Sequence, residues 1–389
     1  MRGKIDNVAP NETTMTHTPA NDANWLTAAL ALATRAVGLT DPNPRVGCVL
    51  IAADGHTVLG EGHTQAAGEA HAEVMALRDA ASRGNSVAGA TAYVTLEPCA
   101  HHGRTGPCCD ALIRAGIARV VQAVGDPNPA VNGQGAARLR AAGVQVEDGP
   151  AHLAIEAREL NIGFFSRMER QRPWLRMKMA ASLDGRSALD NGVSQWITSP
   201  QARTDGHAWR RRAGVVLSGA GTVLEDNPRL DVRLVETARQ PLRAVIDSRL
   251  DTPLDARLFE VDSPVLLFAA HPSPERIDAL RARGAEVICL PDAQGKVDLA
   301  AALAELGARQ INEVHLEAGE RLNASWLRTG LVDELLIYLA PMLIGAGRGM
   351  AALGPLQALE QAARFNFHDV CRIGPDVRVL ARQTTNPPD

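Results

Sequence analysis

Hydrophobic and polar positions follow two repeating patterns along this chain, one typical of strands and one typical of helices. Short apolar or β-branched runs predict strands near residues 46–51, 57–62, 91–96 and 118–124. Apolar residues at helical spacing predict helices near 70–83 and 107–115. Strands that alternate with helices in this way predict a three-layer α/β domain in the first half of the chain.

The pattern continues beyond this half and then restarts. A turn at Asp126 to Pro129 precedes an expected helix near 134–142, a short strand at Val144 to Val146, and a helix within 151–170 that leads into a basic linker. From Trp174, strand-like segments alternate again with short helical ones. These segments are WLRMKMAAS, VVLSG, LRAVIDS, PVLLFAA, AEVICL, EVHLE and DELLIYLAP. The glycine-rich residues after VVLSG are expected to form a turn. The alternation predicts a mostly parallel sheet with ligands at the carboxyl ends of its strands.

Composition changes along the chain set the expected domain boundaries. Residues 1–24 are polar and carry no apolar run, which predicts a disordered tail. The Ala- and Leu-rich stretch from Leu26 to Leu39 is expected to be the first helix of the domain, because it lies too far inside the chain for a signal sequence. The remaining boundaries give a first domain over 25–150, a linker helix over 151–172 and a second domain over 173–384.

Composition also narrows the class of protein. The chain has 389 residues, 46% hydrophobic and 22% charged, as in ordinary soluble proteins of two or three domains. A net charge of -4 argues against general nucleic-acid binding, which requires a basic face. No stretch approaches the ~18 apolar residues of a membrane span. The six cysteines, three of them clustered, do not form a disulfide framework and favour a reducing cytoplasm.

The stretch from Gly68 to Ile113 concentrates residues with metal-binding chemistry. His71 and Glu73 open an expected helix, a β-rich run ends in a turn that carries Cys99, and the pair Cys108-Cys109 follows. One imidazole and two thiolates leave the fourth tetrahedral position of zinc to water, as in a catalytic site. Zinc would lower the pKa of that water from about 16 towards roughly 7. A carboxylate beside it could pass the proton to a ring nitrogen or leaving amine. The stretch therefore predicts hydrolytic deamination.

Other interpretations of these residues stay open on the sequence alone. A lone histidine is more often a core or surface residue, and three cysteines could form a structural zinc knot. His101 and His102 compete as metal ligands, although substrate binding or loop structure suits them better. His56 and His63 bracket a strand and could be polar strand-end residues. The spacing of Glu73 favours the catalytic interpretation.

The motif His71-Ala72-Glu73 followed by Pro98-Cys99 resembles the zinc-dependent nucleoside and nucleobase deaminases, which share H-x-E and P-C-x-x-C. The chain departs from the second motif, since position 102 is histidine and the next cysteines are Cys108 and Cys109. Together, DPNPRVGCVL, GEAHAEV and LEPCAHHGRTGPCCDALI resemble the deaminase half of the bifunctional enzyme family of riboflavin biosynthesis. The strand array from Trp174 resembles the reductase half, so the resemblance covers roughly residues 25–384.

The resemblance implies a cytidine-deaminase-like first domain and a second domain whose fold is like that of dihydrofolate reductase. In the first domain it implies that His71, Cys99 and Cys108 bind one zinc ion, because the family's second cysteine is the first of the pair. It also implies that Glu73 is the general acid and base and that Asn43 binds the pyrimidine edge. A turn asparagine held by its own backbone is the alternative for Asn43.

In the second domain the resemblance implies a bound NADPH. The residues that match the family's cofactor contacts are Ala180, Trp196, Thr222, Asp226, Ser248, Gly319, Glu320, Arg321, Leu322, Asn323, Ala324 and Ser325. Independently, amides in the first turn of a helix after Gly319 can donate to a pyrophosphate, although a plain glycine turn is the alternative. No complete G-x-G-x-x-G motif is present, and Glu320 is unexpected beside phosphates. Asp226 is also a candidate for assisting proton transfer, with turn capping as the alternative.

Five residues of the second domain match the family's substrate contacts. They are Ser194, Arg210, Leu230, Arg233 and Glu317. The two arginines suit a ribose phosphate, because a guanidinium group donates paired hydrogen bonds to phosphate oxygens. Arg211 and Arg212 are more simply a solvated helix face.

These observations predict a bifunctional cytoplasmic enzyme. Named from the resemblance, its first domain deaminates a diaminohydroxy-phosphoribosylamino-pyrimidine and its second reduces the ribosyl group to ribityl with NADPH. A tRNA or nucleoside deaminase with an unrelated C-terminal domain is a rival, but it should show a basic groove and a C-x-x-C pair. A zinc-stabilised binding protein is another, which the retained Glu73 argues against. The expected partner is a small phosphoribosyl pyrimidine, without nucleic acid or membrane, and a homo-oligomer is left open.

Overall fold

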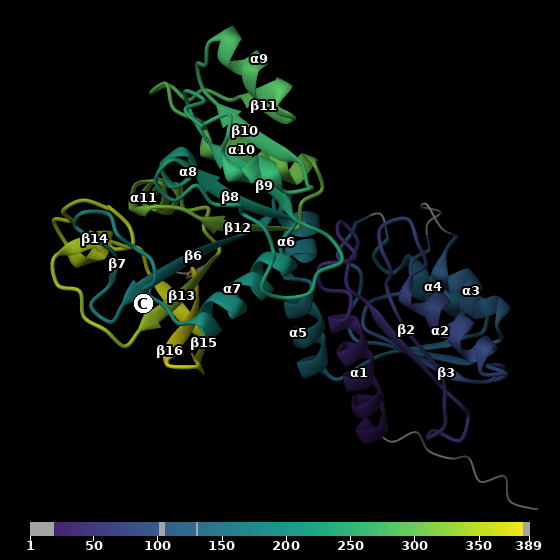
Figure 1. Ribbon diagram of the computed structural model, residues 1–389. Helices are drawn as coiled ribbons and strands as arrows, with labels where there is room; N and C mark the ends of the chain where they lie inside the picture. Colours follow the sequence, from purple (N-terminus) through teal and green to yellow (C-terminus); the bar gives the residue numbers. More distant parts are fainter. Residues whose placement is uncertain (1–18, 101–105, 130, 384–389) are drawn as a thin grey trace, which may run out of the picture. The chain divides into compact units, whose positions relative to one another are not determined.

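The computed structural model describes residues 19–100, 106–129 and 131–383, and the chain forms two compact units (Figure 1). The first unit contains the chain up to Arg35 together with Arg45–Leu160, and the second contains Ala36–Pro44 and the chain from Asn161. The expected linker helix over 151–172 is two helices, α5 (Ala151–Leu160) in the first unit and α6 (Ile162–Arg170) in the second. The basic residues expected in a linker therefore lie mostly within α6.

A five-stranded mixed sheet forms the centre of the first unit. Its strands, in the spatial order β2-β1-β3-β4-β5, are β2 (Val58–His63), β1 (Gly47–Ile51), β3 (Thr91–Val94), β4 (Arg119–Gln122) and β5 (Gln145–Asp148). Both neighbours of β1 are antiparallel to it, whereas β3, β4 and β5 are parallel. Every residue of β1 is buried, as expected for a continuous apolar strand covered on both faces.

Helices cover both faces of this sheet, which confirms the predicted three-layer arrangement. The helices besides α5 are α1 (Pro19–Thr34), α2 (Ala72–Ser82), α3 (Cys108–Arg114) and α4 (Gln134–Ala141). Leu26 and Leu30 of α1 and Leu153 of α5 pack into one core with Val49 of β1. Helix α2 approaches β2 closely, since a Cβ atom at Gly60 would lie 2.3 Å from the carbonyl oxygen of Ala76.

The predicted disordered tail through residue 24 is corrected by the position of α1. This helix begins at Pro19, and Asp22 in its first turn is anchored by the sheet. The Tyr93 hydroxyl donates to Asp22 at 2.7 Å, and Arg119 pairs with the same carboxylate at 2.8 Å. The polar composition of this stretch predicted disorder because Tyr93 and Arg119, which hold Asp22, lie far away in the sequence.

A nine-stranded sheet forms the centre of the second unit. Its spatial order is β11-β10-β9-β8-β12-β6-β13-β16-β15. The strands are β6 (Trp174–Ser182), β8 (Val215–Gly219), β9 (Leu242–Ile246), β10 (Val265–Ala269), β11 (Ala285–Cys289), β12 (Glu313–Glu317), β13 (Glu334–Ala340), β15 (Phe365–Ile373) and β16 (Asp376–Gln383). The first seven strands in the spatial order are parallel, which confirms the prediction of a mostly parallel sheet. The last two pairings, β13 with β16 and β16 with β15, are antiparallel.

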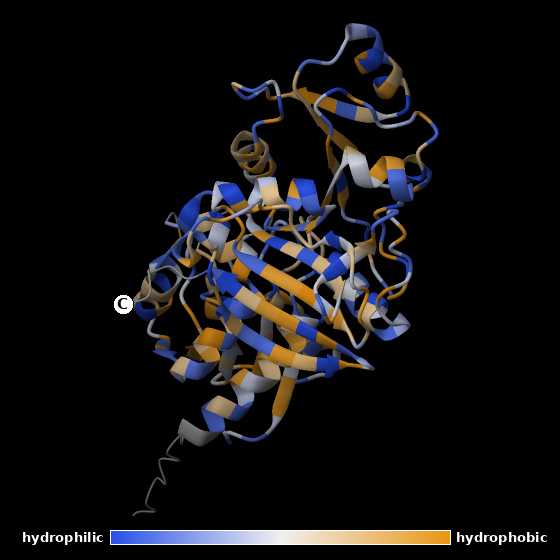
Figure 2. Ribbon diagram, turned by 90° about the vertical axis from the view of Figure 1, so that its left-hand side faces the viewer, coloured by the Kyte–Doolittle hydropathy of each residue, from blue (hydrophilic) through white to orange (hydrophobic). Residues whose placement is uncertain are grey.

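Helices and a small two-stranded sheet complete the second unit. Its remaining elements are β7 (Arg186–Leu189), α7 (Pro200–Arg212), α8 (Ala220–Asp226), η1 (Arg257–Glu260), α9 (Pro274–Ala282), α10 (Leu299–Ala308), α11 (Glu320–Thr329), β14 (Gly347–Gly349) and η2 (Leu359–Gln361). Strands β7 and β14 pair with each other. Helix α7 starts where it does because the Ser199 hydroxyl accepts from the amide of Ala202 and Pro200 occupies the first turn. Figure 2 shows hydrophobic residues along the strands of this unit, interrupted by hydrophilic residues on the strands that face the viewer.

One expectation for this unit needs correction. The glycine-rich residues after VVLSG form helix α8 and not a turn, because Gly219 ends β8 and acts as the N-cap of α8. Gly219 also allows close packing, since a Cβ atom there would lie 2.7 Å from Leu322 of α11. The ends of β8 and β12 are thereby brought together with the helices that follow them.

Candidate active sites

Three predicted metal ligands of the first unit converge at the ends of three elements. His71 is the N-cap of α2, Cys99 follows the turn after β3, and Cys108 is the first residue of α3. The His71 Nδ1 atom lies 3.6 Å from the Cys99 sulfur and 3.3 Å from the Cys108 sulfur. The ligand atoms lie within 4.8 Å of one another, and this is the one such metal-capable group in the part of the chain that the structure describes. One imidazole and two thiolates fit a zinc ion.

The competing ligands are separated from this group or lie outside the described residues. His101 and His102 belong to the segment that is not described. Cys109 is buried, and its thiol contacts Oδ1 of Asp110 at 3.8 Å. The structure therefore brings Cys108, and not Cys109, together with His71.

Hydrogen bonds around the two cysteines favour a thiolate at Cys99. The Cys108 amide donates to the Cys99 sulfur at 3.4 Å. The Cys108 thiol, its amide and His71 lower the pKa of Cys99 to about 4, and the same thiol contact together with burial raises the pKa of Cys108. A thiolate beside a histidine is the form in which cysteine binds metal.

Glu73 lies in the first turn of α2 and is only 3% exposed. Burial, with the nearby Cys99 as a second cause, raises the pKa of Glu73 to about 7. The residue is not one of the three clustered ligand groups. A carboxyl group with this pKa can take up and release a proton near neutral pH.

Glu97 fixes the turn that carries Cys99, and the sequence analysis did not single it out. Its carboxylate accepts hydrogen bonds from the amides of Gly133 at 2.9 Å and Ala136 at 3.1 Å, at the start of α4. A Cβ atom at Gly135 would lie 1.9 Å from the carbonyl oxygen of Pro98, so α4 packs directly on the turn. In the sequence, a glutamate between an apolar strand and a turn that carries a metal ligand can indicate a buried carboxylate that holds the turn. The residues that bind this carboxylate lie too far along the chain to be predicted.

An open cavity of about 760 Å³ adjoins the cluster, since its lining includes the residues that precede His71 and Cys108. Its lining residues are Gln65, Gly68, Glu69, Ala70, Val74, Met75, Arg78, Gly106, Pro107, Ala111 and Arg114. Asn43 lies in the Ala36–Pro44 segment of the second unit, where its amide donates to Thr40 at 2.9 Å. Its contact with the pyrimidine stays a prediction. Among the described histidines, His63 lies 3.1 Å from the Gln65 side chain, and His56 is exposed.

The predicted cofactor residues of the second unit lie along one edge of the parallel sheet. Strands β9, β8, β12 and β6 run in the same direction, so their carboxyl ends lie on the same edge. Ser248 follows β9, Thr222 and Asp226 lie in α8 after β8, and Ala180 lies near the end of β6. The segment from Gly319 to Ser325 follows β12 and forms the start of α11.

Trp196 lies in the segment before α7 and is brought towards the same edge. The Arg203 guanidinium lies 4.5 Å from the centre of the Trp196 ring. The side-chain amide of the neighbouring residue, Gln195, donates to Asp226 at 3.5 Å. Burial and the neighbouring Glu225 raise the pKa of Asp226.

The start of α11 shows how Glu320 is accommodated. Gly319 is the N-cap and offers no side chain to the first-turn amides. The Glu320 carboxylate accepts from the Gly349 amide at 3.1 Å, and its carbonyl oxygen accepts from the amide of Ala352 at 3.0 Å. Within this turn, Asn323 is buried and donates to the carbonyl oxygen of Met350 at 2.9 Å. The acidic side chain is thus bound by the last residue of β14, and the Glu320 backbone is bound by the segment that follows this strand.

Glu317, at the end of β12, is the centre of the predicted substrate site. The Arg210 guanidinium donates to both of its carboxylate oxygens and also to the carbonyl oxygen of Asp231 at 2.7 Å. The Lys178 Nζ atom lies 3.7 Å from the same carboxylate. Burial alone would raise the pKa of Glu317, but Arg210 and Lys178 hold it well below its usual value. The sequence analysis did not identify Lys178, although its position on β6 beside β12 follows from the sheet order.

Leu230 and Arg233 lie in one short segment after α8. The Leu230 side chain is 2% exposed, so that any contact with substrate would come from its backbone. The Arg233 guanidinium donates to the Asp231 carboxylate at 2.6 Å, and its side chain is 47% exposed. Ser194 is half-buried and lies two residues before Trp196.

Fold and site together define a class of protein: a domain with a metal site of the deaminase type, joined to a second domain whose predicted cofactor residues share one edge of a parallel sheet. The described part of the chain contains no helix with the length and apolar character needed to cross a membrane. Comparisons with known proteins identify the family. The RibD C-terminal domain matches residues 173–379, and the cytidine and deoxycytidylate deaminase zinc-binding region matches residues 19–124.

Similarity to individual proteins extends over nearly the whole chain. The riboflavin biosynthesis protein RibD of Escherichia coli is 44% identical over 370 residues, covering 92% of this chain and 98% of that protein. RibD of Aquifex aeolicus is 38% identical and covers 93% of this chain and 98% of that protein. The structure of Acinetobacter baumannii RibD has a TM-score of 0.84 at 38% identity, covering 95% of this chain and all of that one.

A solved structure from Thermotoga maritima agrees with these matches. It is described as a diaminohydroxyphosphoribosylaminopyrimidine deaminase/5-amino-6-(5-phosphoribosylamino)uracil reductase, and it has a TM-score of 0.83 at 32% identity, with 95% of this chain covered. The chain therefore belongs to the RibD family of bifunctional deaminases and reductases of riboflavin biosynthesis. The match over residues 173–379 excludes the alternative of an unrelated C-terminal domain.

Proposed function

We propose that the first unit hydrolytically deaminates 2,5-diamino-6-(5-phosphoribosylamino)pyrimidin-4(3H)-one and that the second reduces the product with NADPH to 5-amino-6-(5-phosphoribitylamino)uracil. The observation that carries this proposal is the cluster of His71, Cys99 and Cys108 with buried Glu73 beside it, in one chain with a RibD reductase domain. The description of the T. maritima relative, which names both reactions, supports the substrates. All six cysteines are free, which supports the proposed cytoplasmic location.

In the deaminase step, water adds to the ring carbon that carries the amino group, and the carbon–nitrogen bond then breaks to release ammonia. Zinc held by His71, Cys99 and Cys108 would supply the Lewis acid that makes water nucleophilic near neutral pH. Glu73 takes the proton of the water and passes it to the ring nitrogen or the leaving amine, for which a pKa of about 7 is suited. The three ligands are positioned by helix ends and by the turn that Glu97 anchors.

In the reductase step, C1 of the ribosyl group gains a hydride, its bond to the ring oxygen breaks, and that oxygen takes a proton. A nicotinamide bound at the carboxyl edge of the sheet would supply the hydride. Arg210 and Arg233 hold the phosphate, with Arg210 itself oriented by Glu317. Asp226 is the proposed assistant in proton transfer, since its raised pKa favours the protonated form.

The experiment is to incubate the zinc-loaded chain with the diaminopyrimidine and NADPH while following ammonia and the absorbance of the reduced nicotinamide. We expect ammonia release without NADPH and nicotinamide oxidation only once deaminated product forms. The Glu73→Gln variant should release almost no ammonia but should oxidise NADPH when the deaminated substrate is supplied. Nicotinamide oxidation by this variant with the diaminopyrimidine itself would contradict the proposed order of steps.

A further inference from the structure

The segment Leu230–Arg233, here named the 230–233 segment, is held from one side by the side chain of Gln240. The Gln240 side-chain oxygen accepts from the Val232 amide at 2.7 Å, and its side-chain nitrogen donates to the Val232 carbonyl oxygen at 2.8 Å. In an antiparallel sheet, one residue of a neighbouring strand makes the same two hydrogen bonds to the amide and the carbonyl oxygen of its partner. Gln240 thus fixes the position of the backbone immediately before Arg233.

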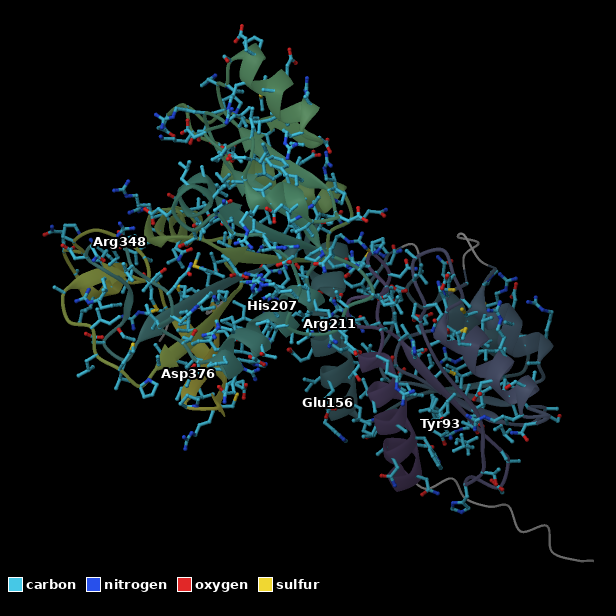
Figure 3. The ribbon with its side chains drawn as sticks, viewed as in Figure 1. Tyr93, Glu156, His207, Arg211, Arg348 and Asp376 are labelled. Carbon is cyan, nitrogen blue, oxygen red and sulfur yellow. The ribbon has the colours of Figure 1, made fainter. Side chains whose placement is uncertain are left out.

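Helix α7 holds the same segment from another side. The Nδ1 atom of His207 accepts from the Arg233 amide at 3.1 Å, and Arg210, three residues further along the helix, donates to the Asp231 carbonyl oxygen at 2.7 Å. His207 is only 5% exposed and lies within the second unit (Figure 3). Burial, and next the charges of Arg210 and Arg233, lower the pKa of His207 to about 4. The imidazole therefore stays neutral and can act as an acceptor at neutral pH.

The backbone conformation of the 230–233 segment also requires such support. Leu230 has φ +54°, in the left-handed region that side chains other than glycine rarely adopt, and its side chain is buried. A residue in this conformation persists where the surrounding structure over-determines it. The contacts from Gln240, His207 and Arg210 provide that constraint.

Arg233 is the group that this support presents to the site. Asp231 accepts from one end of its guanidinium at 2.6 Å, while 47% of its side chain is exposed. Since guanidinium carries five N–H donors, hydrogens remain that can be directed at a phosphate. The affinity for that phosphate depends on how little Arg233 has to reorganise on binding.

We infer that Gln240 and His207 are positioning residues of the reductase: they hold the 230–233 segment so that Arg233 meets the substrate phosphate in a pre-formed orientation. This inference rests on the proposed function, in which the second unit reduces a phosphorylated ribosyl substrate. Neither residue needs to touch the substrate. Both act on the peptide group that joins Val232 to Arg233: Gln240 donates to its carbonyl oxygen, and His207 accepts from its amide.

The test compares 5-amino-6-(5-phosphoribosylamino)uracil with its dephosphorylated counterpart in steady-state reduction by the full chain. Gln240→Met keeps the length of the side chain and removes both hydrogen bonds. We expect it to raise the KM for the phosphorylated substrate about tenfold, because the loss of one hydrogen bond weakens binding by about this factor. The kcat, the KM for NADPH and ammonia release should change little, and the dephosphorylated substrate should be insensitive.

Two further variants separate positioning from a general loss of structure. His207→Leu should raise the same KM about fivefold, because the Arg233 amide then loses its hydrogen-bond acceptor. His207→Asn should restore it, because the asparagine Oδ1 is as many bonds from Cβ as the histidine Nδ1. Gln294→Met, in an exposed turn of the same unit, is the matched control for the glutamine change and should have no effect.

A double-mutant cycle with Arg233→Ala decides whether the two residues act through Arg233. If they do, Arg233→Ala combined with Gln240→Met has the KM of Arg233→Ala alone. Additive effects, or an equal rise in KM for both substrates, would overturn the inference. If Arg233→Ala does not discriminate between the substrates, the phosphate site of the proposed function fails instead. If it does discriminate while Gln240→Met and His207→Leu behave like wild type, only the positioning inference fails.

Discussion

Two glutamates, buried Glu73 in the first unit and partly buried Glu317 in the second, are both shielded from solvent, but the charges around them have opposite signs. Burial and the Cys99 thiolate raise the pKa of Glu73 to about 7. Glu317 is also withdrawn from solvent, yet Arg210 and Lys178 hold its pKa well below the usual value. Burial therefore does not determine the role of a carboxylate; the sign of its nearest charges does.

This difference matches the chemistry proposed for each unit. A carboxyl group that titrates near neutral pH can exchange protons with water and with a leaving amine. A carboxylate held by two cations stays ionised, so it can orient those cations and accept hydrogen bonds but cannot deliver a proton. Glu73 is accordingly assigned to proton transfer and Glu317 to fixing Arg210 and the substrate.

The largest effect is expected when the carboxyl group of Glu73, which titrates near neutral pH, is removed. Glu73→Gln should lower deamination by about a thousandfold, within the range that general acid–base catalysis contributes. Zinc content should stay near one per chain, because the carboxylate moves protons and does not bind the metal. Metal analysis and ammonia release measure the two quantities. A variant that lost zinc as fully as Cys99→Ser would show that Glu73 is a ligand.

The cluster beside Glu73 provides the second test. Cys108→Ser should weaken zinc binding by at least about a hundredfold, more than the loss of an outer-shell partner alone causes. Cys109→Ser should retain zinc, since the Cys109 thiol contacts Asp110 and lies outside the clustered ligand atoms. Chelator competition on the two purified variants measures the difference. Equal depletion of zinc in both would contradict the choice of Cys108.

Removing Arg210, one of the two cations beside Glu317, should make the pKa of Glu317 more like that of Glu73. Arg210→Ala should raise the pKa of Glu317 and lower kcat/KM for reduction by about a hundredfold, which lies within the roughly 2 to 5 kcal/mol lost when a buried pair loses one partner. Arg233→Ala, which removes a more exposed arginine, should raise KM about thirtyfold. Ammonia release should be nearly intact in both. Parallel loss of both activities would show that the two functions are not separable in this way.

The sequence predicted the metal cluster well because its chemistry is local. His71 and Glu73 share one helix start, and Cys99 and Cys108 follow within one strand-turn-helix unit. The anchoring role of Glu97 could not be predicted, because its amide partners, Gly133 and Ala136, lie at the start of α4, more than thirty residues further along the chain. The expected strands and the mostly parallel sheet followed from periodicity, whereas the pair β15 and β16 has mixed burial and did not.

The second unit was less predictable because its candidate site is assembled from the ends of several strands. The resemblance to a known family supplied Arg210 and Glu317, but not that the Arg210 guanidinium is already bound by Glu317 on two of its nitrogen atoms. Lys178, His207 and Gln240 carry no local motif. Each becomes visible only when the sheet order and the 230–233 segment place it beside a predicted residue.

The remaining expected effect concerns stability and not activity, and it depends on His207, a buried histidine that stays neutral. Its pKa is about 4 in the folded chain, against an ordinary value near 6.5. Burial comes first among the causes, followed by Arg210 and Arg233, while Glu317 and Asp231 act in the opposite direction. Between these two pH values the unfolded chain binds more protons, so the contribution of His207 makes stability fall as pH falls from 6.5 towards 4.

His207→Asn keeps an acceptor for the Arg233 amide but does not titrate in this range. We expect its free energy of unfolding to be close to that of wild type at pH 7 and to fall less steeply below pH 6.5, with a difference of up to about 3 kcal/mol by pH 4. Denaturant unfolding followed by tryptophan fluorescence measures this in the full chain, because four of the five tryptophans lie in the second unit. Identical pH dependence in the two proteins would mean that the pKa of His207 is the same in the folded and the unfolded chain, and burial beside Arg233 would then not hold the imidazole neutral.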